Sequence, residues 1–140
     1  MVPITIIIAD DHDLVRESWK QLLDKDNTRF KVIAVLKNGK EAVEQVVKLS
    51  PDIVLMDVNM SPVNGFEATE RIIKASPHAK VIGISINNHP AYAEKMLAHG
   101  AKGYITKTST LKEVKNAIQK VHHGETYICE EIRKRMRDGL

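Results

Sequence analysis

Short apolar runs alternate with amphipathic stretches along the chain. The spaces between the runs show apolar residues at intervals of three, four or seven positions, which is the spacing of one face of a helix. The runs themselves are mostly rich in isoleucine and valine, as strands buried on both faces are: Ile4 to Ala9, Phe30 to Leu36, Ile53 to Met56, Val81 to Ile86 and Tyr104 to Thr106. The pattern predicts a strand followed by a helix, five times over.

This alternation predicts an α/β fold with a five-stranded parallel sheet and helices on both faces. Parallel strands need crossover connections, and these are almost always right-handed. In doubly wound sheets of this kind, ligands bind at the carboxyl ends of the strands. The residues that directly follow each apolar run are therefore the first candidates for chemistry.

Composition agrees with a single globular domain. The chain has 140 residues, of which 43% are hydrophobic and 28% charged. Its apolar runs are far shorter than the roughly 20 residues of a membrane-spanning helix. No basic region precedes the acidic pair Asp10-Asp11, so the N-terminus does not resemble a secretory signal, and we expect a soluble, cytoplasmic protein. Cys129 is the single cysteine and has no partner for an internal disulfide or a cysteine-rich metal site.

The net charge of the C-terminal residues differs little from that of the rest of the chain. The net charge of +3 is too small to argue for nucleic-acid binding by itself. Within residues 125–140, Ile128, Ile132 and Met136 are four positions apart, as on one side of a helix. We therefore predict a domain over residues 1–124 and a linker or short C-terminal helix over residues 125–140. The basic residues from Arg133 to Arg137 are interpreted as a solvated face of that segment.

Five polar side chains follow strands of the predicted sheet: Asp10, Asp11, Asp57, Ser85 and Lys107. Three carboxylates that lie close together raise each other's pKa unless a cation neutralises them, and oxygen ligands suit Mg²⁺. A lysine and a serine hydroxyl can hold phosphoryl oxygens. The set therefore favours a phosphoryl-transfer site over a redox or acyl-transfer site.

At residues 4–123 the chain resembles the response-regulator receiver domain of two-component signalling. The resemblance rests on Ser85, on Gly65 eight residues after Asp57, and on three motifs at strand ends: Ile6-Ile7-Ile8-Ala9-Asp10-Asp11-His12, Val54-Leu55-Met56-Asp57-Val58-Asn59-Met60 and Gly103-Tyr104-Ile105-Thr106-Lys107. It implies a flavodoxin-like sheet with strand order 2-1-3-4-5.

The resemblance implies a phospho-acceptor rather than an ordinary enzyme. Asp57 would attack the phosphorus of a kinase phosphohistidine and form an acyl phosphate. Mg²⁺ would be held by the side chains of Asp11 and Asp57, by the backbone carbonyl of Asn59 and, through water, by Asp10. The chain would thereby assist its own magnesium-dependent phosphorylation and dephosphorylation.

The resemblance also implies a switch. Lys107 would pair with the phosphoryl group, and Ser85 would move to bind it. The movement of Ser85 would open room for Tyr104 to rotate inward, which would couple the charge at the site to the surface around the fourth helix and fifth strand.

Details of the sequence are similar to the LuxR/NarL-type branch of the family, notably the segments Gly103 to Ser109 and Gly124 to Ile128. The implied partner is a sensor histidine kinase, and DNA would be bound only through a helix-turn-helix domain that this chain lacks. The helix that contains Leu111 and Val121 could support a homodimer. A stand-alone receiver that acts through protein contacts is the alternative.

The chain departs from the common receiver pattern at Ser61, at Thr108 and at Ile86, which is larger than the alanine commonly found there. Ser61 stands where many receivers have proline, with Pro62 next, so the loop after Asp57 could follow a different path. Thr108 replaces the proline that often follows the lysine, which puts the usual cis bond there in doubt.

Three other classes of function fit less well. A phosphatase of the haloacid-dehalogenase kind also uses an aspartyl phosphate, but it generally has a second acid where Asn59 stands. A nucleotide-binding module would need a glycine-rich phosphate loop, and neither GxGxxG nor GxxxxGK[ST] occurs. A degenerate receiver would not need the intact acidic set. The six histidines, including His12, are assigned solvated or packing roles.

Overall fold

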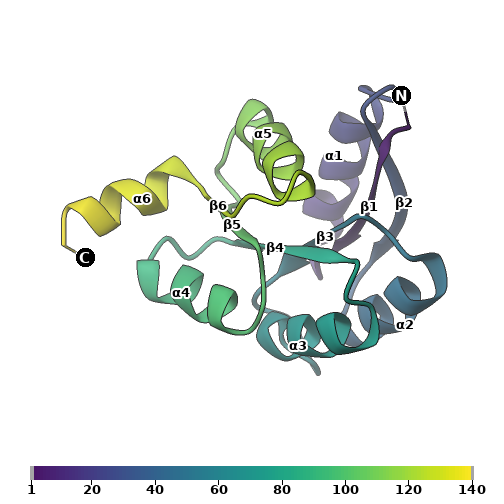
Figure 1. The fold of residues 1–140 in the computed structure, drawn as a ribbon, viewed down its shortest axis with the longest axis horizontal. Helices are drawn as coiled ribbons and strands as arrows, with labels where there is room; N and C mark the ends of the chain where they lie inside the picture. Colours follow the sequence, from purple (N-terminus) through teal and green to yellow (C-terminus); the bar gives the residue numbers. More distant parts are fainter. Residues whose placement is uncertain (1, 140) are drawn as a thin grey trace.

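The computed structural model describes residues 2–139 as one parallel sheet with helices on both faces (Figure 1). The elements in chain order are β1 (Ile4–Ala9), α1 (Asp13–Asp24), β2 (Phe30–Leu36), α2 (Gly39–Leu49), β3 (Ile53–Asp57), α3 (Gly65–Ala75), β4 (Lys80–Ser85), α4 (Pro90–Ala98), β5 (Gly103–Thr106), α5 (Leu111–His122), β6 (Tyr127–Ile128) and α6 (Glu130–Arg137). In Figure 1, α1 and α5 cover one face of the sheet, and α2, α3 and α4 cover the other.

The strand order is β2-β1-β3-β4-β5-β6, and all pairs are parallel. The predicted α/β class and the order of the first five strands are confirmed. The predicted number of strands is wrong by one, because Tyr127 and Ile128 pair with Gly103 and Tyr104 as a short sixth strand. A strand of two residues carries no alternation of apolar and polar positions, so the sequence pattern could not reveal it.

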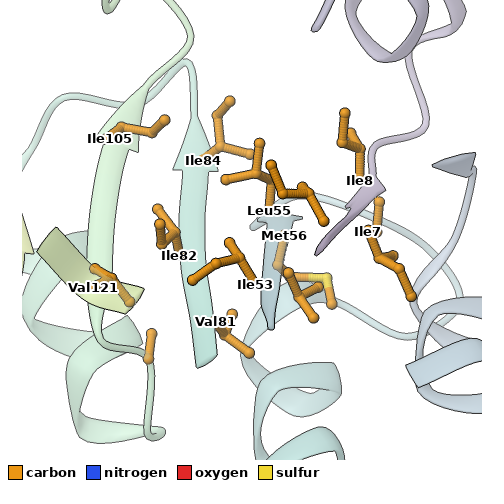
Figure 2. Close-up of a cluster of buried hydrophobic side chains, with 14 of the residues drawn as sticks. Ile7, Ile8, Ile53, Leu55, Met56, Val81, Ile82, Ile84, Ile105 and Val121 are labelled. Carbon is orange, nitrogen blue, oxygen red and sulfur yellow. The ribbon is translucent and has the colours of Figure 1, made fainter. Parts of the chain in front are cut away.

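The central strands are buried on both faces, which explains why they read as continuous apolar runs. Figure 2 shows the result, with Ile7 and Ile8 of β1, Leu55 and Met56 of β3, and Ile82 of β4 in one packed cluster. All five side chains are almost completely removed from solvent. This rigid core fixes the carboxyl ends of β1, β3 and β4 relative to one another.

Helix starts follow the polar residues that precede them. The side chains of Asn38, Asn64 and Thr110 each accept a hydrogen bond from a backbone N–H in the first turn of α2, α3 and α5. Gly65 begins α3 close to the end of β3, where a Cβ atom would lie 2.7 Å from Val58 Cα. Only glycine allows this approach, which draws the loop after Asp57 tightly against the strand. In that loop the Ser61-Pro62 peptide bond is cis.

The C-terminal segment is packed into the domain. Cys129 and Ile132 are fully buried, and Tyr127 is nearly so. The N–H of Cys129 donates to the carbonyl of Tyr104 at 3.0 Å, which continues the pairing beyond β6. In the segment 125–140, for which we predict a linker or a short C-terminal helix, the structure has the helix α6, which closely follows a strand of the sheet. None of the helices within residues 2–139 has the length and apolar character needed to cross a membrane.

Candidate phosphoryl-transfer site

The candidate functional site lies at the carboxyl ends of β1, β3 and β5. Asp10 and Asp11 directly follow β1, Asp57 is the last residue of β3, and Lys107 directly follows β5. Because β1 and β3 are neighbours, their terminal aspartates meet at one edge of the sheet. The long side chain of Lys107 reaches the same place from across β4. Four of the five predicted polar residues thus gather at this edge: the three aspartates lie close together, and Lys107 pairs with Asp10 and Asp57.

Asp57 is held in a buried, charged pocket. Its side chain is 1% exposed; Oδ1 accepts a hydrogen bond from the N–H of Asn59 at 3.1 Å, and Oδ2 lies 3.3 Å from Lys107 Nζ. Burial raises the pKa of Asp57 to about 6, with a further contribution from the negative charge of Asp10. Lys107 and the N–H of Asn59 oppose that rise only in part.

Lys107 joins the two buried carboxylates. Its Nζ lies 3.0 Å from Asp10 Oδ2 and 3.3 Å from Asp57 Oδ2, and the lysine side chain is only 9% exposed. Asp10 Oδ2 is itself buried and accepts no hydrogen bond of good geometry, in spite of this close ion pair. The pocket therefore retains an incompletely satisfied carboxylate oxygen, which is a ligand atom available to a cation.

His12 is the residue of the site that sequence reasoning missed. Its Nδ1 lies 2.9 Å from Asp10 Oδ1, 3.0 Å from Asp11 Oδ1 and 3.0 Å from Lys107 Nζ. The imidazole is more than half exposed and covers the acidic pair from the solvent side. The signal was its place directly after Asp10-Asp11, but the orientation of a side chain in a loop is set by tertiary contacts.

Ser85 and Tyr104 make hydrogen bonds to residues other than Asp57. The hydroxyl of Ser85 accepts hydrogen bonds from Asn59 Nδ2 at 3.4 Å and from the N–H of Asn87 at 3.0 Å. Tyr104 is fully buried, and its hydroxyl donates to the carbonyl of Asn87 at 2.9 Å. Burial raises the pKa of Tyr104 to about 12, so it remains a neutral donor. Tyr104 therefore already points inward in this structure.

The carboxylates can hold a metal ion. Ligand atoms from Asp10, Asp11, His12 and Asp57 all lie within 4.8 Å of one another. Asp11 is 42% exposed, whereas Asp10 and Asp57 are buried. A site that combines buried and exposed carboxylates suits a hard divalent cation.

The raised pKa of Asp57 leads to a prediction for the metal-free protein. A carboxyl whose pKa is higher in the folded than in the unfolded state binds its proton more tightly when folded, so the free energy of unfolding falls as pH rises from about 4 to about 6. We expect the carboxyl ¹³C resonance of Asp57 to titrate near pH 6. A midpoint at the ordinary value for aspartate would contradict this account.

Comparison with known proteins gives the class of this fold and site. The model of the response regulator receiver domain family matches residues 6–119. The chain is 41% identical over 129 residues to the transcriptional regulatory protein DegU of Brevibacillus brevis, an alignment that covers 92% of this chain and 54% of DegU. It is 38% identical over 133 residues to the transcriptional regulatory protein LnrK of Bacillus subtilis (strain 168), covering 95% of this chain and 60% of LnrK.

Comparison with solved structures gives the same class of protein. A two-component response regulator of the LuxR family from Aurantimonas sp. SI85-9A1 superimposes with a TM-score of 0.91 at 28% identity, covering 98% of this chain and 97% of that one. The signal receiver domain of the response regulator NarL from Mycobacterium tuberculosis gives a TM-score of 0.85 at 26% identity, covering 89% of this chain and 100% of that one. The fold is that of a flavodoxin-like receiver. The chain belongs to the response regulator receiver domain family, and its relatives are of the LuxR/NarL type; it spans about half the length of the curated relatives it matches.

Proposed function

We propose that Asp57 is the phospho-acceptor of this receiver domain. The observation that carries the proposal is the placement of this buried carboxylate at the end of β3, 3.3 Å from Lys107 Nζ and beside Asp10 and Asp11. In the transfer, an oxygen of Asp57 bonds to the phosphorus of a phosphohistidine, the phosphorus–nitrogen bond breaks, and its electron pair leaves with the imidazole. The donor would be a sensor histidine kinase.

The metal is proposed to be Mg²⁺. Asp11 and Asp57 would hold it through their side chains, Asn59 through its backbone carbonyl, and Asp10 through bound water. The unsatisfied Oδ2 of Asp10 and the oxygen-rich donor set support this choice. When bound, Mg²⁺ supplies positive charge that offsets the negative charge of the transferring phosphoryl oxygens.

Lys107 and Ser85 are proposed to bind the phosphoryl group once it is on Asp57. Lys107 can turn to a phosphoryl oxygen because its Nζ already lies beside Asp57 Oδ2. Ser85 would have to move, since its hydroxyl is hydrogen-bonded to Asn59 and Asn87. Tyr104 is proposed as the second switch residue. Since it is already inward, its role would be to maintain or release its bond to the carbonyl of Asn87, and it needs no entry from the surface.

The wider role is that of a transcriptional regulator of the LuxR/NarL type. We propose that the receiver works in the cytoplasm and controls DNA binding by an output domain that lies outside this chain. The segment 125–140 would lead toward that domain. A stand-alone receiver remains the alternative. Self-association through α5 stays a prediction.

The test is to incubate the whole chain with acetyl phosphate in the presence of Mg²⁺ or of excess EDTA. We expect a gain of one phosphoryl group in intact mass, only with Mg²⁺, and peptide mapping should locate it at Asp57. An unmodified mass for the folded protein with Mg²⁺, or a phosphoryl group at another residue, would refute the proposal.

A further inference from the structure

The side chain of Glu131 in α6 forms hydrogen bonds to the loops that follow β4 and β5, beside the candidate site. Its carboxylate accepts hydrogen bonds from Asn88 Nδ2 at 2.7 Å, Thr106 Oγ1 at 3.0 Å and Thr108 Oγ1 at 3.2 Å. Asn88 lies in the loop after β4, whereas the two threonines flank Lys107 at the end of β5. A single carboxylate therefore bridges the two loops beside the phospho-acceptor pocket.

Apolar side chains also hold α6. Ile132 is fully buried and Met136 is half-buried against the core, but the side chains of Arg133, Lys134 and Arg137 are exposed. In Figure 1, α6 extends away from the sheet. The pKa of Glu131 is lowered, chiefly by the hydrogen bond from Asn88, so the side chain is a carboxylate at neutral pH. Loss of the Glu131 contacts would leave Ile132 and Met136 to pack α6 against the domain, but it would remove the bonds from this carboxylate to both loops.

Hydrogen bonds connect this bridge to Asp57. The N–H of Asn59 donates to Asp57 Oδ1, and the Asn59 side chain donates to the hydroxyl of Ser85. The N–H of Asn87 donates to the same hydroxyl at 3.0 Å. The next residue is Asn88, which donates the shortest of the three bonds to the α6 carboxylate. A change at Asp57 thus reaches α6 through one short loop.

We propose that Glu131 is the contact through which the state of Asp57 is transmitted to α6, and that phosphorylation loosens this helix. This inference rests on the proposed function. All three bonds of Glu131 are made without a phosphoryl group, so a movement of Ser85 and Lys107 toward one displaces donors on both loops. At least one bond then lengthens. Because α6 leads out of the receiver, its release alters how a following domain is held.

Coupling between two sites is reciprocal in free energy. If a ligand at Asp57 loosens α6, then a variant that loosens α6 must bind that ligand more tightly. The same contact can therefore be tested from both ends: by following α6 when the pocket is filled, and by measuring affinity at the pocket when Glu131 is changed.

The first experiment measures hydrogen–deuterium exchange of the whole chain with and without beryllofluoride and Mg²⁺. We expect amides in residues 129–137 to exchange at least about 5-fold faster when beryllofluoride is bound, in line with typical coupling between sites. In Glu131→Gln they should exchange fast at the outset, with little further change. Glu130→Gln is the matched control, since it removes the same charge from the same turn and Glu130 bonds only to Arg133 and Arg137 through its side chain.

The second experiment measures beryllofluoride affinity by ¹⁹F NMR. Glu131→Gln should bind about 5-fold more tightly than the wild type. Asn88→Ala keeps Glu131 and removes its closest donor, so its beryllofluoride affinity should also rise. This variant provides the test if Glu131→Gln does not fold.

Unchanged or slower exchange of residues 129–137 in the wild type with beryllofluoride bound would overturn the inference. Equal exchange rates of residues 129–137 in Glu130→Gln and Glu131→Gln would also overturn it, because a general effect of helix charge would then explain the result. Failure of beryllofluoride to bind the wild type is recognised by the absence of a bound ¹⁹F signal. That result would refute the proposed function itself, and the coupling with it.

Discussion

Replacement of Asp57 by asparagine is expected to reduce phosphoryl incorporation from acetyl phosphate by at least about 100-fold, because an amide cannot supply the carboxylate nucleophile. The same change should stabilise the metal-free protein at pH 8. The raised pKa of Asp57, about 6, means that its charged form is disfavoured in the fold at that pH. A rise in pKa from 3.8 to about 6 corresponds to about 3 kcal/mol in the free energy of unfolding. Urea unfolding followed by circular dichroism measures it.

Asp11→Asn is the control that separates the two effects of Asp57. Asp11 is 42% exposed, so the loss of its charge should change stability little. It would still remove a proposed Mg²⁺ ligand and therefore reduce phosphoryl incorporation. Asp57→Asn should be more stable and inactive, whereas Asp11→Asn should be less active at nearly unchanged stability. Wild-type incorporation into Asp57→Asn would show that the acceptor is another residue.

Replacement of Lys107 by methionine is expected to destabilise the metal-free protein by about 3 kcal/mol at pH 8, since it leaves buried charges without their partner. Asp10 and Asp57 are each 1% exposed, and Lys107 Nζ lies within 3.3 Å of both. The destabilisation should become smaller as pH falls toward 5, because a proton on one carboxylate removes the repulsion between the pair. Thermal and urea unfolding at several pH values measure this dependence.

Lys112→Met provides the comparison, because it removes an equal charge from an exposed position at the start of α5. Exposed substitutions of this kind usually change stability by less than about 0.5 kcal/mol. Mg²⁺ should restore part of the stability of Lys107→Met, since ligand binding to the folded state adds to its stability. A Lys107→Met protein that is as stable as Lys112→Met at pH 8 would contradict the view that the lysine neutralises the two carboxylates.

The placement of Asp10, Asp11, Asp57 and Lys107 could be predicted because it follows from topology. In a parallel sheet every strand ends at the same edge, so residues that directly follow apolar runs must gather there. The family resemblance then added the order of the strands, which decides that β1 and β3 are neighbours. The part of the site that depends on backbone direction alone could therefore be predicted from the sequence.

The part that depends on side-chain orientation was not. His12 was grouped with solvated histidines, yet its ring lies over Asp10 and Asp11. The inward position of Tyr104 is likewise set by its bond to the carbonyl of Asn87. Both arrangements are decided by neighbours from other elements. The spacing of residues along one segment carries no information about these neighbours.

The sequence by itself determined the alternation of strands and helices, the buried character of the sheet and the strand-end residues, because each depends on local periodicity and chain direction. Tertiary structure alone decided how the last part of the chain packs against the domain. Tyr127 and Ile128 became a strand only because the edge of β5 was open to them. Glu131 bonds to Asn88, 43 residues earlier, only because that pairing carries α6 to the edge of the site. Contacts across such separations have no local signal, since they arise when finished elements pack together.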